Sequence, residues 1–334
     1  MVRDTSTKGF EFSSMGIGSV LKAHRLKVPP YQREYAWDTE AVEQLLEDFA
    51  SAKEENKDYF LGTIVTINDT SNKVLEIVDG QQRLTTTAIF IAAIRDYLVQ
   101  ITSAEMIVES INNEFLSIID RFAGQRVSRL MLNIDDNVFF QELIGEQNLN
   151  KIPNPTRESH RLLLEAKKIA DKKVKLIANA SQAADINLIF NNWIEFIENN
   201  ASVVLLQAQN ASQAFKMFET LNDRGMKTNQ ADLVKSYLFG QAGKSITTSI
   251  AKWSSIRDNL EEISDDDRLI NFLRHTFIAT IQFVRAEEIY EETQKRFRGE
   301  ANSVLFLSDL ERFSKFTLRH FNQIRVTGSI MRTV

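Results

Sequence analysis

The sequence predicts an α+β fold: a small mixed sheet with helices, a large all-helical insertion and a helical C-terminal region. Two β-rich runs, at 60–67 and 73–78, flank a polar turn and predict a hairpin. Most of the remaining chain carries apolar residues at helical spacing. One further strand pattern lies late, at 202–207. Because a strand is not stable alone, we expect it to join the N-terminal sheet.

These observations predict four regions. Residues 1–101 form the first part of the α/β core and residues 102–200 the helical insertion. Residues 201–240 supply the return strand and helices that complete the core, and residues 241–334 form the helical C-terminal region. One apolar stripe supports the helical insertion and consists of Ile111, Phe115, Ile118, Ile119 and Phe122.

The elements before the hairpin are predicted from local chemistry. Residues 28–33 contain two prolines, which favour an extended backbone. Asp38 or Thr39 can cap the next helix. Four apolar residues at helical spacing form its buried face: Val42, Leu45, Leu46 and Phe49.

Composition narrows the class of protein. The formal net charge is -5, so DNA contact would require a local basic patch. There is no cysteine, which excludes disulfides and cysteine-based zinc sites. The N-terminus lacks a signal-peptide core, and the apolar run 88–94 is too short to span a bilayer. We therefore expect a cytoplasmic protein with no membrane partner.

The motif at 79–86 is the most informative part of the chain. A strand ends at Asp79, Gly80 makes a turn, and a helix begins at Gln81. A cation at a helix N-terminus is disfavoured by about 0.3–1 kcal/mol, so Arg83 is unexpected there unless an anion lies beside it. A phosphate would fit. An ordinary turn with exposed polar residues is the alternative.

Two other clusters of polar residues are candidates. In the segment 29–37, Tyr31, Gln32 and Arg33 could contact bases or phosphates. Trp37 is predicted to be a core residue, and for Tyr35 a surface role and a core role both stay open. The turn 218–225 carries Arg224 near a helix C-terminus, where it complements the helix dipole, so a structural role is favoured there. The lysine run 167–175 is predicted to be a solvated helix face.

Four segments together resemble one family. They are 30–37, 59–64, 79–86, and 218–225 followed by 231–235. In this order, over roughly residues 15–240, they are similar to the N-terminal domain of GmrSD-type modification-dependent restriction enzymes, also found in Ssp phosphorothioate-sensing systems. That family is related to the ParB/sulfiredoxin fold, in which a similar strand–turn–helix arginine motif binds nucleotide phosphates.

The resemblance implies a domain that hydrolyses GTP or ATP with Mg²⁺, and a fold that gathers these segments around one cleft. The implied catalytic residues are Asp79, Gln81, Gln82 and Arg83, with Asp79 also a metal ligand. The implied nucleotide-binding residues are Gly80, Arg83, Thr85, Thr86, Gln32, Arg33, Asn222, Asp223 and Arg224. The implied DNA-binding residues are Tyr31, Gln32 and Arg33.

The implied partners are modified double-stranded DNA and a nuclease domain or subunit, and a homo-oligomer is left open. Full-length relatives usually carry an HNH-type nuclease with an Asp-x-x-His-Ile-like segment, which we do not find. We therefore expect a truncated chain or a nuclease on a separate subunit. Two alternative functions stay open: a non-catalytic DNA-binding or regulatory module, and a ParB-like nuclease that cuts DNA directly.

Overall fold

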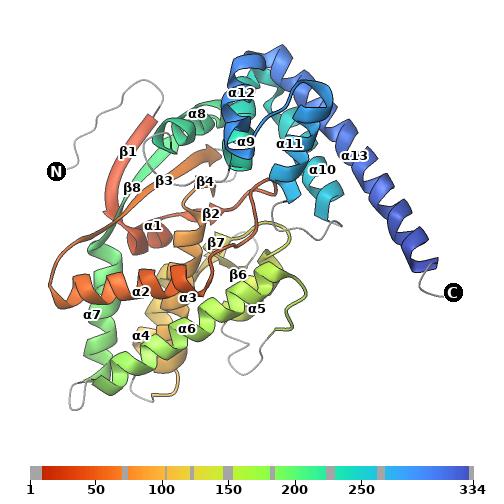
Figure 1. Ribbon diagram of the computed structural model, residues 1–334. Helices are drawn as coiled ribbons and strands as arrows, with labels where there is room; N and C mark the ends of the chain where they lie inside the picture. The colour runs from red at the N-terminus through yellow and green to blue at the C-terminus, as the bar shows by residue number, and fades with distance from the viewer. Residues whose placement is uncertain are drawn as a thin grey trace. The chain divides into compact units, whose positions relative to one another are not determined.

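The computed structural model confirms the α+β prediction and divides the chain into two compact units, Met1–Ala208 and Gln209–Val334. It describes residues 10–69, 74–101, 104–120, 124–145, 153–180, 185–222, 230–261 and 268–330 (Figure 1). The region 201–240 is shared between the units, because its strand lies in the first unit and its helices lie in the second. In the described part of the chain, no helix is long and apolar enough to cross a membrane.

The first unit contains a six-stranded mixed sheet with the order β1-β8-β3-β4-β2-β7. The late strand β8 lies inside this sheet, antiparallel to β1 and parallel to β3, which confirms that it joins the N-terminal strands. The sheet strands are β1 (Phe10–Gly16), β2 (Arg25–Lys27), β3 (Tyr59–Asp69), β4 (Val74–Asp79), β7 (Leu130–Met131) and β8 (Ala201–Ala208).

The predicted hairpin is present as the antiparallel pair β3–β4, in which Val65 lies opposite Asp79. Strand β3 is irregular on its other edge, where its register with β8 shifts between Phe60 and Thr63. Such a bulge removes residues from the hydrogen-bond ladder and leaves their backbone groups available to side chains. Leu61 and Gly62 form this bulge.

Seven α-helices of the first unit are described: α1 (Ile17–Ala23), α2 (Thr39–Glu54), α3 (Gln81–Leu98), α4 (Glu105–Ile111), α5 (Asn137–Ile144), α6 (Glu158–Ala180) and α7 (Ile186–Asn199). Asp38 caps α2 as predicted, because its carboxylate accepts from the Ala41 backbone N–H at 2.9 Å, and the predicted apolar face of α2 is buried. Helix α3 is buried on almost every side. It packs against α1, α4, α5, α6 and α7, and Figure 1 shows α6 crossing the first unit beside α2.

The prediction that 102–200 is entirely helical is wrong. A short π-helix at Asn112–Leu116 ends the helical run, and the strands β5 (Ser117–Asp120) and β6 (Gln125–Ser128) form a two-stranded sheet. Ile118 and Ile119 therefore belong to a strand, as their β-branched side chains favour. Phe122 lies outside the described residues. Strand β7 then pairs with β2, so this region also contributes to the main sheet.

The described part of the second unit is helical, as predicted for the C-terminal region. Its α-helices are α8 (Ala211–Asn222), α9 (Gln230–Gln241), α10 (Ile246–Glu261), α11 (Arg268–Thr280), α12 (Ile289–Arg296) and α13 (Glu300–Ile330). Edge-to-face aromatic pairs join its elements, with Phe239 packed against Phe215 and Trp253. A stacked pair, Phe297 and Phe306, joins the end of α12 to α13.

Candidate functional site

The motif adopts the predicted strand–turn–helix geometry. Strand β4 ends at Asp79, Gly80 has a left-handed backbone with φ of 94°, and α3 begins at Gln81. A Cβ at Gly80 would lie 2.9 Å from Cγ1 of Ile64, so both the dihedral angle and the space require glycine. The N-cap position of α3 is Gly80, which has no side chain to cap the helix, and the N-terminal end of a helix carries a partial positive charge.

Arg83 is held by two acceptors. Its Nη1 donates to the Leu61 carbonyl at 2.7 Å, and its Nη2 lies 3.1 Å from Oδ2 of Asp79. Gly62, with φ of 98°, makes room for this arrangement, because a Cβ there would lie 2.9 Å from Nη1. The sequence analysis predicted an anion beside Arg83, and in this structure the Asp79 carboxylate is an anion at that place. Only 12% of the Arg83 side chain is exposed, against 27% for Asp79.

The glutamines of the motif hold the segment 31–36 against α3. Gln82 makes two bonds to that backbone: its Nε2 donates to the Glu34 carbonyl at 3.1 Å, and its Oε1 accepts from the Ala36 N–H at 3.0 Å. Gln81 Nε2 donates to the Arg33 carbonyl at 3.0 Å. Gln32, which lies in the segment itself, donates from Nε2 to the Val78 carbonyl at 2.8 Å. The structure thus brings 31–36 and 78–86 together, as the family resemblance implied.

A second set of residues, which sequence reasoning missed, holds the same segment from the other side. Asp136 accepts from the Tyr35 N–H at 2.7 Å and from the Ser159 hydroxyl at 2.6 Å. Asn133 Nδ2 donates to the Gln32 carbonyl at 3.3 Å. These partners lie about a hundred positions from the segment in sequence, and no local pattern marks them.

Burial dominates the electrostatics of this region. It raises the pKa of the Asp136 carboxyl, although the bonds from Ser159 and the Tyr35 N–H act in the opposite direction. It also raises the pKa of the Tyr31 and Tyr35 hydroxyls far above their ordinary value. Both tyrosines are therefore neutral at physiological pH.

The predicted site residues differ in exposure. Tyr31 is 3% and Gln32 5% exposed, whereas Arg33 is exposed, so only Arg33 of the predicted DNA contacts reaches solvent in this arrangement. Thr85 and Thr86 are buried. The Thr85 hydroxyl donates to the Gln81 carbonyl, and the Thr86 hydroxyl bonds to that of Tyr35. The side chain of Asn222, and both Asp223 and Arg224, lie outside the described residues.

Comparison with known families decides the identity. The family model for the N-terminal domain of the GmrSD restriction endonuclease matches residues 17–239. The chain belongs to the GmrSD N-terminal domain family. This finding confirms the resemblance and places the chain in a restriction endonuclease family. No curated protein compared with the chain matches it.

One small cavity of this GmrSD domain lies at the motif. The cavity beside Gln81 and Gln82 is about 10 Å³ and reaches Arg33, Tyr35 and Asp136. That is about the space of a single water. Oε1 of Gln81 is buried there and has no hydrogen-bond partner in the described structure. An acceptor of this kind requires a donor, which bound water or a ligand can supply.

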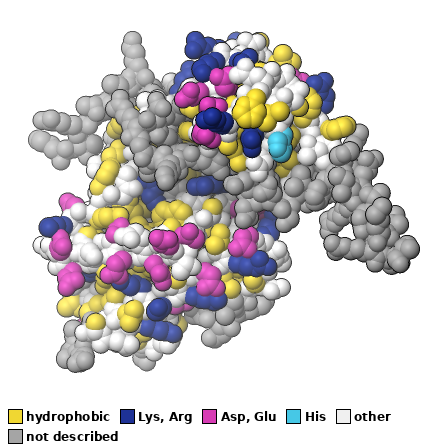
Figure 2. Space-filling model, viewed as in Figure 1, with side chains coloured by type: hydrophobic (Ala, Val, Ile, Leu, Met, Phe, Trp, Pro, Cys, Tyr) yellow, Lys and Arg dark blue, Asp and Glu magenta, His cyan; other side chains and the backbone are white. Residues whose placement is uncertain are grey.

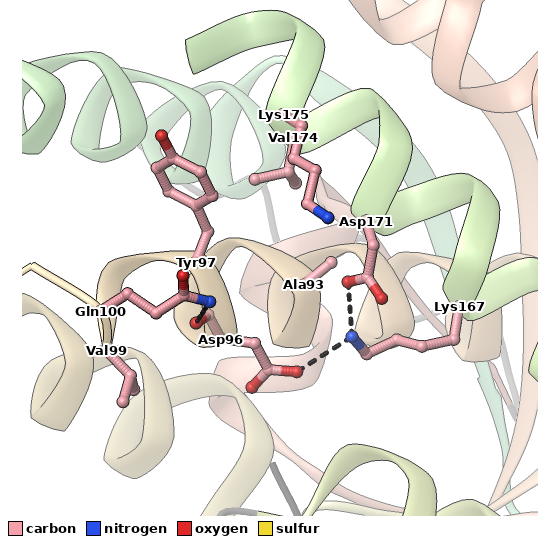
Figure 3. A pocket seen from close by; sticks show the side chains of 9 residues that line it. All are labelled: Ala93, Asp96, Tyr97, Val99, Gln100, Lys167, Asp171, Val174 and Lys175. Carbon is pink, nitrogen blue, oxygen red and sulfur yellow. Dashed lines mark hydrogen bonds and ion pairs between the residues drawn. The ribbon is translucent and has the colours of Figure 1, made fainter. Parts of the chain in front are cut away.

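A larger cavity of the GmrSD domain, about 480 Å³, lies between α3 and α6, away from the motif. Figure 3 shows Lys167 pointing toward two carboxylates, with its Nζ 2.9 Å from Asp96 and 2.5 Å from Asp171. Asp96 also pairs with the buried Arg95 at 2.6 Å. Two cations and two carboxylates therefore balance each other, and this network joins the C-terminal half of α3 to α6.

The outer surface of α2 and α6 is mixed in charge. Figure 2 shows Asp and Glu side chains gathered over α2, with Lys and Arg side chains along α6. Lys168 pairs with Glu165, and Lys173 pairs with Glu47 of α2. Lys168 is exposed, as predicted for the lysine run, but Lys167 is buried. Within the described residues, no three His, Cys, Asp or Glu side chains are grouped to hold a metal ion.

Proposed function

We propose that this chain is the nucleotide-hydrolysing sensor domain of a modification-dependent restriction system. The family supports a role in restriction, and hydrolysis is our assignment. One observation carries it: Gln81 joins the exposed Arg33 segment to the uncapped N-terminal end of α3, where Arg83 also lies. Two arginines close in the fold to the positive end of one helix suit a polyphosphate.

In this proposal, phosphate oxygens replace the Asp79 carboxylate as the partner of Arg83. The exchange keeps the guanidinium neutralised at the positive end of α3 and releases the Asp79 carboxylate. The Leu61 carbonyl keeps Nη1 in place, so only Nη2 changes partner. Arg33 supplies the second positive charge. Catalysis of this kind depends on positioning and electrostatic stabilisation.

Magnesium suits the proposed chemistry. Mg²⁺ bound with a nucleotide takes most of its ligands from phosphates and water and needs only one or two protein carboxylates. Asp79 is the carboxylate at the motif, and its side chain is 27% exposed. When bound, Mg²⁺ would neutralise phosphate charge. Gln81 would use its unpartnered Oε1 to orient a water, while Gln82, Thr85 and Thr86 hold the scaffold.

We propose further that hydrolysis is coupled to recognition of modified double-stranded DNA and to licensing of a nuclease. Of the three predicted DNA contacts, Arg33 is the exposed one and offers a guanidinium to a backbone phosphate. Tyr31 and Gln32 hold the segment from inside.

A second candidate function is a non-catalytic module that grips DNA phosphates with the same residues. The small size of the cavity beside Gln81 and Gln82 favours it, because a nucleotide does not fit in that cavity. Strongly salt-dependent DNA binding without hydrolysis would be its signature.

Phosphate release from GTP and from ATP with Mg²⁺ tests the proposal, without DNA and with plain or modified DNA. Arg33→Ala should abolish turnover with the fold intact, because Arg33 is exposed. Arg161→Ala, an exposed arginine on α6 paired with Glu158, is the control and should keep wild-type turnover. Absence of turnover in the wild-type chain under every condition would favour the binding module.

A further inference from the structure

We propose that Asp136 is a positioning residue that fixes the segment 32–36 and thereby sets where Arg33 is presented. Its relevance to nucleotide binding rests on the proposed function. The placement itself rests only on contacts in the structure. The sequence motifs assign no role to Asp136, which directly precedes α5 in the region predicted to be a helical insertion.

The carboxylate of Asp136 joins two elements. One oxygen accepts from the Tyr35 N–H at 2.7 Å, two residues after Arg33. The other accepts from the Ser159 hydroxyl at 2.6 Å, on the first turn of α6. The Asp136 side chain is 1% exposed, so water does not compete for either oxygen.

Neighbouring residues orient Asp136 and strengthen the same connection. The Asn133 side chain accepts from the Asp136 N–H at 3.0 Å and donates to the Gln32 carbonyl. Arg157 pairs with Glu34 and with Asp135, at 3.4 and 3.1 Å. The segment therefore has anchors on both sides of Arg33, at Gln32 and at Glu34–Tyr35.

Burying a carboxylate in a protein core is energetically unfavourable. Removing a charge from water carries a free-energy cost that hydrogen bonds offset only in good geometry. An apolar side chain could fill the space, but it would leave the Tyr35 N–H unpaired. A role in fixing the position of the Tyr35 backbone explains why a carboxylate is buried at this place despite its free-energy cost. Tyr35 in turn bonds to Thr86 of α3, so Asp136, Tyr35 and the motif helix form one connected chain.

The Asp136→Asn variant tests the placement directly. The amide keeps the shape but has a single accepting oxygen, so one of the two bonds loses its acceptor and the other loses its charge. The chain has three tryptophans, and Trp37 lies next to the segment, whereas Trp193 and Trp253 lie in α7 and α10. With 5-fluorotryptophan incorporated, we expect the ¹⁹F resonance of Trp37 to shift or broaden while those of Trp193 and Trp253 stay in place.

Two results would overturn the inference. An unchanged Trp37 resonance would show that Asp136 does not hold the segment. Equal changes at all three tryptophans would show a general structural role. Asp58→Asn is the matched control: Asp58 is exposed, accepts from Asn200, and should leave all three resonances unchanged.

A kinetic arm connects the placement to the proposed site. If the segment holds the competent position only about one fifth of the time, the apparent affinity for nucleotide falls about fivefold. We therefore expect Asp136→Asn to raise KM about fivefold and change kcat less than twofold. A lower kcat at unchanged KM would contradict positioning of Arg33. If the wild-type chain has no turnover, the proposed function fails, and the ¹⁹F measurement still decides the placement.

Discussion

The double hydrogen bond from Gln82 to the backbone of 34–36 gives a sharp prediction about stability. In the Gln82→Met variant, a side chain of similar length and helix propensity replaces the amide, so packing is retained. What disappears is the pair of bonds to the Glu34 carbonyl and the Ala36 N–H, at 3.1 and 3.0 Å. The Gln82 side chain is only 6% exposed.

The magnitude follows from the two backbone groups left without partners. A buried donor or acceptor without a partner costs about 1–3 kcal/mol. Both bonds are only partly buried, so water replaces part of what is lost. We therefore expect Gln82→Met to lower the free energy of unfolding of the first unit by about 2–3 kcal/mol.

Urea unfolding measures this loss. In a Trp253→Phe background, the remaining tryptophans, Trp37 and Trp193, both lie in the first unit and report its unfolding by fluorescence. The control is Gln44→Met on the exposed face of α2, which removes a single bond to Asp48 and should cost less than about 0.5 kcal/mol. Equal losses for the two variants would refute the conclusion that Gln82 holds the segment.

Three other predictions concern Arg83, the α3–α6 network and Asp136. Gly62→Ala should lower the free energy of unfolding in urea by about 2 kcal/mol more than Gly124→Ala does. Both glycines have positive φ, but of the two only Gly62 lies against Arg83. Equal losses for the two variants would contradict this prediction. Lys167→Met should lower the free energy of unfolding by about 3 kcal/mol at pH 7, because two carboxylates lose their shared cation. The loss should be smaller at pH 5, because burial raises the pKa of Asp171. A loss that does not depend on pH would contradict this prediction. Because burial raises the pKa of Asp136 above 3.8, the folded protein binds that proton more tightly than the unfolded chain. Relative to Asp136→Asn, the wild type should therefore gain stability in urea as pH falls from 7 toward 4, and a constant difference would contradict the assignment.

Local sequence signals predicted the parts of the fold that local chemistry determines. The Asp38 cap, the apolar face of α2, the β3–β4 hairpin and the turn at Gly80 all lie within a few residues of their signals. The late strand β8 was placed by a global argument, because it had no local partner.

The errors occurred where long-range pairing overrides a local pattern. Ile118 and Ile119 continue a helical stripe in sequence, yet they pair with β6. Strands β2 and β7 are three and two residues long, and their pairing across about a hundred positions has no local signature. The site shows the same division. The family resemblance implied the contact between 31–36 and 78–86. Nothing in the sequence pointed to Asp136, Asn133 and Ser159, because only the folded chain brings them to the segment.

Nucleotide binding tests the central claim most directly. Calorimetric titration of the wild-type chain with GTPγS and with ATPγS, each with Mg²⁺, measures binding apart from turnover. We predict that at least one binds, that Arg161→Ala binds equally, and that Arg33→Ala binds about tenfold or more weakly, as expected for loss of a charge-assisted bond. If neither nucleotide binds, or if Arg33→Ala binds like the wild type, the motif is not a nucleotide site.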